Sequence, residues 1–187
     1  MLFVQVRRVA DGRRVRGEQR RSELLAATLA VIERDGVAGV SHRVVAAEAD
    51  VSVASITYHF PTLDALLVAA LQSAAEDLAV ELDGRGSELG ARPADELARL
   101  IEHSAVRRRG RTLALYELYL YAARRPDLRE AASAWLEPLT EIARAFAGDP
   151  QKARLLVAAL DGLLMHALIG ARDVDRRDLA ALLEVLR

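Results

Sequence analysis

Cysteine is absent from this chain of 187 residues. Its absence excludes disulfide bonds, thiolate nucleophiles and cysteine-based zinc sites. Long hydrophobic runs are also missing, because the longest apolar stretch, residues 155–171, is interrupted by Asp161, Gly162 and His166. That stretch falls short of the ~18–20 apolar residues that a membrane-spanning helix needs. We expect a soluble cytoplasmic protein with no membrane partner.

The sequence motifs that mark enzymes and metal sites are missing too. There is no glycine-rich phosphate loop, no His-Glu-x-x-His, no Gly-x-Ser-x-Gly, and no pair of carboxylates at an evident cleft. The four histidines fall in separate predicted helices and have no metal-ligand spacing. We therefore predict a protein that is not an enzyme and that has no cofactor or metal.

The chain does contain enough apolar sequence for a core, since 52 % of its residues are apolar and 28 % are charged. This balance excludes disorder along most of the length. The apolar residues recur with the period of a helix, and no convincing run alternates as in a strand. We predict an all-α fold of about nine helices, in one or two small domains.

Positive charge gathers at the N-terminal end, although the net charge of the chain is −1. Residues 1–21 contain seven arginines and two acidic residues, whereas residues 61–187 contain 17 basic and 20 acidic residues. An uneven distribution of this kind favours one surface that binds a polyanion. We interpret residues 1–16 as a basic arm that is expected to be disordered. A solvated tail, or a start codon placed too far upstream, would explain residues 1–14 equally well.

Turn signals divide residues 17–82 into four predicted helices. They are residues 17–34, 42–48, 53–59 and 63–82. Ser41 and Ser52 are good N-caps for the second and third of these helices, and Pro61 interrupts the chain before the fourth. The two short helices are not stable alone, so the first and fourth must clamp them. This arrangement leaves the outer face of residues 53–59 free, as in a helix-turn-helix that enters the major groove.

The residues of the two short helices divide into an apolar set and a polar set. The side chains expected to face inward are Val44, Val45, Ala49, Val51, Ala54, Ile56 and Phe60. The side chains expected to face outward are Ser52, Ser55, Thr57, Tyr58 and His59. The outward residues can all donate hydrogen bonds to phosphates or base edges, which an ordinary helical corner would not require.

Residues 36–67 read GVAGVSHRVVAAEADVSVASITYHFPTLDALL. This run resembles the N-terminal domain of the TetR-family (tetracycline-repressor-like) transcriptional regulators. The positions that match the family pattern are Ser41, Val45, Ala46, Ala49, Val51, Ser52, Ile56, His59, Phe60 and Leu66. The departures are Asp50 for the usual glycine of the turn, Thr57-Tyr58 for an aromatic shifted by one position, and Leu63 for a phosphate-contacting lysine. Aspartate tolerates a left-handed backbone better than most residues, so we expect the turn to form.

The resemblance implies a DNA-binding domain over residues 17–62 and a ligand-binding and dimerisation domain over residues 63–187. The residues that it places on DNA are His42, Arg43, Ser52, Val53, Ser55, Thr57, Tyr58 and His59. Arg43 is the best candidate for a guanine edge, with a solvated surface charge as the alternative. His59 could instead cap a helix or lie in the core. The N-terminal arginines are the obvious substitute for the missing lysine.

A single helix-turn-helix reads too few base pairs to find one operator, so we expect a homodimer on a palindromic site. Two apolar stripes near the C-terminus are the candidate interface, and the resemblance implies that they pair in a four-helix bundle. Their residues are Leu156, Ala159, Leu160, Gly162, Leu163, Leu179, Leu182, Leu183 and Leu186. Periodicity alone indicates only that they are buried, so a core within one chain is the alternative.

Aromatic residues are only 4 % of the chain, and most of them lie between residues 116 and 146. Inside a helical bundle such rings can line an apolar cavity whose few polar tips orient a small molecule. The candidate pocket residues are His103, Tyr116, Glu117, Tyr119, Trp135, Asp161, Met165 and His166. A place in the core would explain each aromatic and histidine as well, and a buried hydrogen bond between helices or subunits would explain Asp161.

These observations together predict a homodimeric, DNA-binding transcriptional regulator. Families of this kind are most often repressors, and we expect a small-molecule effector to release the protein from double-stranded DNA. One alternative is a DNA-binding regulator without an effector, controlled by a protein partner or by abundance. The other is an all-α enzyme or scaffold in which the helix-turn-helix is incidental.

Overall fold

The structure is a computed structural model, and it describes residues 2–84, 92–129, 133, 136–170 and 175–185. Within these ranges every regular element is a helix, which confirms the prediction of an all-α fold. The chain forms two compact units, Met1–Ala70 and Leu71–Arg187. The boundary between the units lies inside the helix α4 (Leu63–Asp83), some way beyond the domain boundary expected at residue 62. One continuous helix therefore begins in the first unit and ends in the second.

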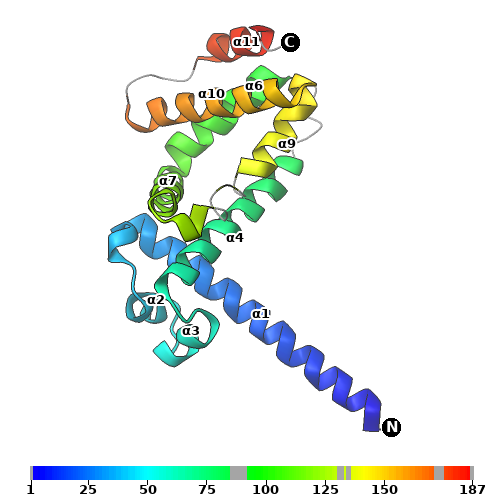
Figure 1. The fold of residues 1–187 in the computed structure, drawn as a ribbon, viewed down its shortest axis with the longest axis vertical. Coiled ribbons are helices and arrows are strands. Elements are labelled where there is room, and N and C mark those ends of the chain that lie inside the picture. The colour runs from blue at the N-terminus through cyan, green and yellow to red at the C-terminus, as the bar shows by residue number, and fades with distance from the viewer. Residues whose placement is uncertain (1, 85–91, 130–132, 134–135, 171–174, 186–187) are drawn as a thin grey trace. The chain divides into compact units, whose positions relative to one another are not determined.

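The first unit is built from three further helices and a short turn (Figure 1). They are α1 (Leu2–Asp35), the 3-10 turn η1 (Val37–Gly39), α2 (His42–Glu48) and α3 (Val53–His59). The bounds of α2 and α3 are those predicted from the sequence. Gly36 ends α1 with a φ of 73°, a conformation that glycine adopts without steric cost.

The N-terminal arm differs from its prediction. We expected residues 1–16 to be disordered, but α1 begins at Leu2 and continues without a break to Asp35. The physical reason lies in the composition, because this segment has no proline and its many arginines are good helix formers. Two glycines, each costing about 1 kcal/mol relative to alanine, are too few to interrupt it.

Aliphatic side chains hold the first unit together. Helix α1 packs on α2, and α2 packs on α3. The largest fully buried side chains of this unit are Leu24, Ile32, Ile56, Phe60, Leu66 and Leu67. The buried hydroxyl of Thr28 donates to the carbonyl of Leu24 at 2.7 Å, so this polar group carries no desolvation penalty. The two short helices thus gain from packing on α1 and on each other the stability that they lack alone.

The second unit consists of the C-terminal part of α4 and the helices that follow it (Figure 1). These are α6 (Pro93–Glu102), the π-helix η2 (His103–Arg107), α7 (Arg109–Ala123), the 3-10 turn η3 (Pro126–Leu128), α9 (Leu136–Ala147), α10 (Pro150–Leu168) and α11 (Arg176–Val185). Pro93 and Pro150 each occupy the first turn of a helix, where a missing N–H costs nothing. Asp149 caps α10 by accepting from the N–H groups of Gln151 and Lys152, and these bonds lower the pKa of its carboxyl.

The segment 126–147 departs from its prediction at its start. The sequence predicts a single helix over 126–147 with a kink at Pro138, whereas the structure has the 3-10 turn η3 first and then helical residues at Arg129, Ser133 and Leu136–Ala147. The kink at Pro138 stays a prediction.

Two clusters of buried apolar residues form the core of the second unit. In one, α10 packs on α9 through Ala143, Ala153, Leu156 and Val157. In the other, α11 packs on α6 through Leu97, Ile101 and Leu179, and Arg176 pairs with Asp95 between the same two helices. Leu160 of α10 contacts both clusters and so joins them.

Among the described residues, no single helix is long and apolar enough to cross a membrane. The bent pair formed by Val53–His59 and Leu63–Leu78 reaches that length and composition when the two are taken together.

Candidate DNA-binding face and ligand cavity

The turn between α2 and α3 is fixed by three local features. The hydroxyl of Ser41 accepts from the N–H of Val44 at 3.2 Å, and that of Ser52 accepts from the N–H of Ser55 at 3.2 Å. Asp50 has a φ of 52°, so it occupies the left-handed conformation that glycine adopts most easily. Both predicted N-caps and the predicted turn at Asp50 are therefore confirmed.

The C-terminal end of helix α3 is anchored by contacts with α1 and α2. Ile56 and Phe60 are buried, and the guanidinium of Arg21 from α1 lies 4.6 Å from the centre of the Phe60 ring. The ring of His42 from α2 bonds through Nε2 to the carbonyl of Phe60 at 2.9 Å, so that nitrogen carries the proton. These contacts fix the direction of α3 from both neighbouring helices.

The opposite face of α3 is open to solvent. Tyr58 is 83 % exposed and Val53 is 43 % exposed, so both large side chains lie largely in solvent. Arg43 of α2, Ser52 and Thr57 are exposed as well. This polar and aromatic surface, made by Arg43, Ser52, Val53, Thr57 and Tyr58, is called the recognition face below.

The structure places the remaining predicted DNA contacts beside this face. Ser55 and His59 are half-buried, and the His59 ring meets Tyr58 edge-on with centroids 5.2 Å apart. His42 is half-buried and already bonded within the chain, so it fastens α2 to the end of α3. The prediction that Ala54 faces inward is wrong: Ala54 is exposed, because on α3 it lies between the outward Val53 and Tyr58 rather than above Ile56.

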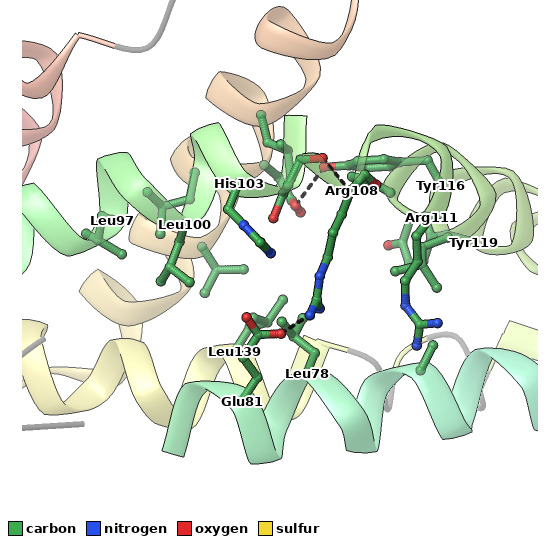
Figure 2. Close-up of a pocket in the computed structure, with 18 of the residues that line it drawn as sticks. Leu78, Glu81, Leu97, Leu100, His103, Arg108, Arg111, Tyr116, Tyr119 and Leu139 are labelled. Carbon is green, nitrogen blue, oxygen red and sulfur yellow. Dashed lines mark hydrogen bonds and ion pairs between the residues drawn. The ribbon is translucent and has the colours of Figure 1, made fainter. Parts of the chain in front are cut away.

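The second unit contains a cavity of about 210 Å³ (Figure 2). Side chains from α4, α6, η2, α7, α9 and α10 line it, and most of them are apolar. The apolar lining consists of Ala74, Leu78, Leu97, Leu100, Leu115, Leu139, Ala143, Leu156, Val157, Leu160 and Leu164. The polar and aromatic lining consists of Asp77, Glu81, His103, Ser104, Arg108, Arg111, Thr112, Tyr116, Tyr119 and Asp161. Concave, largely apolar sites with a few polar groups are typical of small-molecule binding.

One wall of the cavity carries a hydroxyl and a carboxylate in contact. The Tyr116 hydroxyl donates to Oδ1 of Asp161 at 3.1 Å. Burial raises the pKa of Asp161, and the hydrogen bond from Tyr116 offsets part of that rise. Burial, and then the negative charge of Asp161, raise the pKa of the Tyr116 hydroxyl. Among the described residues, the carboxylate of Asp161 thus contacts a hydroxyl and no cation.

Another wall carries two ion pairs between α4 and the start of α7. Arg108 bonds to Glu81 at 2.7 Å and Arg111 bonds to Asp77 at 2.9 Å. Asp77 and Glu81 are one turn apart on α4, so the two pairs lie one above the other along the cavity. Figure 2 shows Arg108 extended toward Glu81 on α4, with Arg111 beside it.

His103 opens the π-helix η2 and lines the cavity. Its Nε2 atom is buried and has no hydrogen-bond partner, and Figure 2 shows the ring between Leu100 and Arg108. A buried polar atom without a partner is costly and therefore rare. Single π-helical turns are frequent at functional sites.

The eight predicted pocket residues divide into three groups. The structure brings His103, Tyr116, Tyr119 and Asp161 together around the cavity. Glu117, Met165 and His166 do not line it, and Glu117 and His166 point to solvent. Trp135 lies outside the described residues.

Sequence reasoning missed Asp77, Glu81, Arg108 and Arg111 as cavity residues. Their helical spacing on two separate segments is the signal that a search for facing charges would have used. The partners are 27 and 34 positions apart in the chain, so no local pattern joins them.

The predicted interface residues are mostly used inside the chain. Leu156 and Leu179 are buried in the two cores and leave no surface for a partner. For these two residues the structure agrees with the alternative interpretation, a core within one chain. Leu160, Leu163, Leu182 and Leu183 are half-buried against these cores. Ala159 is half-buried and Gly162 is exposed, while Leu186 lies outside the described residues.

Among the described residues, no group of three or more histidine, aspartate or glutamate side chains could hold a metal ion.

An anchored helix with an exposed polar face, after a tight turn, defines a helix-turn-helix DNA-binding protein. The second unit, with its lined cavity, fits the class of regulators that combine such a reader with a ligand-binding domain.

Comparison with known proteins gives the family. Residues 24–70 match the model of bacterial regulatory proteins of the tetR family, and residues 90–187 match that of the tetracyclin repressor-like C-terminal domain. The chain therefore belongs to the TetR family of transcriptional regulators. No curated protein sequence matches it.

Two solved structures illustrate the likeness. The multidrug binding protein EbrR in complex with ethidium is 41 % identical, with a TM-score of 0.78 over 89 % of this chain and 98 % of EbrR. EbrR has also been solved with proflavin and with malachite green. SCO1917, a TetR-family member from Streptomyces coelicolor A3, is 41 % identical, with a TM-score of 0.74 over 89 % of this chain and 97 % of SCO1917.

Proposed function

We propose that this protein is a homodimeric transcriptional repressor that binds a palindromic operator and leaves it when a small molecule occupies the cavity. The observation that carries the proposal is the recognition face, which exposes Tyr58 and Arg43 on a helix anchored by Phe60. The family supplies the regulatory context. The cavity supports control by an effector over the alternative of a regulator without one.

The recognition face has the chemistry of a reader of double-stranded DNA. Arginine can bond both acceptors of a guanine edge in the major groove, and serine, threonine and tyrosine hydroxyls can bond phosphates. In a two-fold symmetric dimer the two α3 helices would enter successive major grooves, about 34–36 Å apart. A palindromic operator follows from that symmetry.

The effector that we propose is an aromatic cation whose charge is delocalised over several rings. Ethidium, proflavin and malachite green, which EbrR binds, are all of this class. The cavity offers such a molecule the rings of Tyr116 and Tyr119, leucine side chains, and the carboxylate of Asp161. An aromatic ring attracts a cation by its face, and a carboxylate in a partly apolar site attracts it further.

Helix α4 is the element that would carry the effect of the ligand to DNA. It contributes Leu66 and Leu67 to the core of the first unit, and Leu78 and Glu81 to the cavity of the second. A ligand can release DNA only by the difference between its affinities for the bound and released conformations. A movement of the C-terminal part of α4 is the simplest source of such a difference.

An electrophoretic mobility shift assay with the DNA that flanks the gene of this protein tests sequence-specific DNA binding. We expect a specific complex whose affinity falls steeply with salt, because phosphate contacts release counterions. Malachite green should then dissociate that complex. An Asp161→Asn variant controls for any effect of the dye on DNA itself, because it should keep the operator bound at the same dye concentration. Absence of binding at low salt would refute the proposal.

Sedimentation velocity tests the dimer. Gly162 lies on the exposed side of α10, and nothing in the described part of the chain lies within 4 Å of a Cβ atom built there. Gly162→Glu should therefore spare the monomer but place two charges in an α10 interface, which shifts the dimer toward monomer. Dimers of unchanged stability would place the interface elsewhere, and a wild-type monomer would exclude the homodimer.

A further inference from the structure

The ion pair between Glu81 and Arg108 belongs to the cavity, although both groups come from this chain. Their side chains line the cavity and meet at 2.7 Å. The Glu81 side chain is 22 % exposed, whereas that of Arg108 is 50 % exposed. The carboxylate is therefore held at the cavity, while the guanidinium has a path to solvent.

The size of the cavity requires that something moves before a three-ring cation can bind. Sites for drug-sized ligands have volumes of roughly 300–1,000 Å³, whereas this cavity has about 210 Å³. Arg108 reaches across this space toward α4 (Figure 2). Its departure would add volume and would also leave the Glu81 carboxylate facing the ligand.

The backbone around Arg108 allows this movement without unfolding. Arg108 ends η2, and its N–H donates to the carbonyl of His103 at 2.9 Å. The hydroxyl of Thr112 bonds to the carbonyls of Ser104 at 2.8 Å and of Arg108 at 3.0 Å. The backbone at this point is thus tied to both neighbouring elements, while the side chain is free to rotate into solvent.

The second ion pair does not have these properties. In the Asp77–Arg111 pair the carboxylate is the exposed partner, at 67 %, and the guanidinium is the more buried one, at 30 %. A carboxylate that is largely exposed to water attracts a cation only weakly, because the high dielectric constant of water and dissolved salt screen its charge. Arg108, and not Arg111, is therefore the cation that a ligand could replace at a held carboxylate.

We infer that Arg108 is a built-in competitor of the cationic effector: its guanidinium occupies Glu81 in the empty cavity, and an aromatic cation binds by displacing it. This inference rests on the proposed effector class. Binding then exchanges one cation for another at Glu81, while Asp161 supplies the second carboxylate. Because Glu81 lies in the last turns of α4, the same exchange removes the ion pair between α4 and Arg108, the residue that follows η2. Recognition of the ligand and loss of this contact of α4 then become one event.

The inference predicts opposite effects from the two halves of one ion pair. Arg108→Gln removes the competitor and should tighten ethidium binding by roughly two- to fivefold, the range that partly exposed ion pairs contribute. Glu81→Gln removes the counter-ion and should weaken ethidium binding by a similar factor. A merely structural ion pair would give changes of the same sign in both variants, because both break the same contact.

The experiment is a fluorescence titration of the full-length protein with ethidium in the absence of DNA. Arg144→Gln is the matched control, since it removes a guanidinium from an exposed i,i+3 pair on α9 that does not line the cavity. It should leave ethidium affinity unchanged. Acridine in its neutral form, a ring system of similar size, is the uncharged probe. Its affinity should be the same for wild type, Glu81→Gln and Arg144→Gln.

Two further variants keep the test decisive if Arg108→Gln folds poorly. Arg108→Met keeps the apolar stem and should also tighten binding, whereas Arg108→Lys keeps a competing charge and should resemble wild type. One outcome is that wild type binds ethidium while neither Arg108→Gln nor Arg108→Met binds it more tightly. That result would overturn the inference and leave the proposed function standing. No ethidium binding by wild type or by the neutral variants would overturn the proposed effector class, and the inference with it.

Discussion

The two units of this protein present their functional residues in opposite ways. In the first unit Tyr58 and Arg43 project from a surface, and the neighbouring residues Ile56 and Phe60 are completely buried beneath them. In the second unit the cavity is concave, and four of its charged groups form two ion pairs. In the proposed function, DNA is read by side chains that are fixed before it binds, whereas a small molecule is enclosed by side chains that can exchange partners.

The largest effect should come from the support beneath the recognition face. Phe60→Ala should lower the free energy of unfolding by about 3–5 kcal/mol, because it leaves a cavity in the core and removes the ring under Arg21. Tyr58→Ala should change that free energy by no more than about 0.5 kcal/mol, because the ring is 83 % exposed and buries little area. Urea denaturation followed by circular dichroism measures both. Equal losses would remove the distinction between support and surface.

The next effect concerns the surface itself. Arg43→Ala should cost roughly 1–3 kcal/mol of discrimination between the operator and point-mutated operators if Arg43 reads a base. Competition binding assays with single-base substitutions measure it. A uniform loss on all sequences would make Arg43 a phosphate contact, and an unchanged affinity would remove it from the interface.

The cavity should respond to pH in a way that the recognition face does not. Burial raises the pKa of Asp161, and the ionised carboxylate is the form that attracts a cation. Ethidium affinity should therefore be full above that raised pKa and should fall by roughly three- to tenfold as the pH drops through it. Titrations at a series of pH values measure the fall. In Asp161→Asn the affinity should be low and should lack this component, and an unaltered pH profile would exclude Asp161 as the counter-ion.

The smallest effect is a gain in stability at the turn. Asp50 holds a φ of 52°, which costs a residue with a Cβ more than it costs glycine. Asp50→Gly should therefore raise the free energy of unfolding by about 0.5–1 kcal/mol without altering operator affinity. Thermal denaturation and mobility shift measure the two quantities. A loss of stability would indicate that the Asp50 side chain stabilises the turn by more than the strain costs.

The helix-turn-helix was predictable because its determinants are local. Ser41 and Ser52 act on N–H groups three residues away, and Asp50 acts on its own backbone. The sequence therefore predicted the bounds of α2 and α3. It failed on α1, where only the absence of a helix breaker distinguishes an ordered segment from a charged tail.

The cavity was predictable only in part. Tyr116 and Tyr119 share a face of one helix with apolar neighbours, so periodicity predicts their common direction, and it also placed the solvent-facing Glu117 with them by mistake. The charged lining could not be found in this way, because Arg108 and Glu81 become neighbours only when α4 and η2 are brought together. The π-helical turn at His103 adds to the difficulty, since it changes the register of the helix that follows.

Local hydrogen bonds and helical periodicity, both written in the order of the residues, determined the all-α class, the two short helices, their caps and the polar outer side of α3. The tertiary structure decided which leucines of α10 and α11 are buried in this chain, which carboxylates have cations beside them, and that Asp161 accepts a hydrogen bond from Tyr116. The physical reason is the distance along the chain over which each interaction acts. A cap or a turn acts over a few residues, whereas burial and charge pairing depend on segments that only the folded packing brings within a few ångströms.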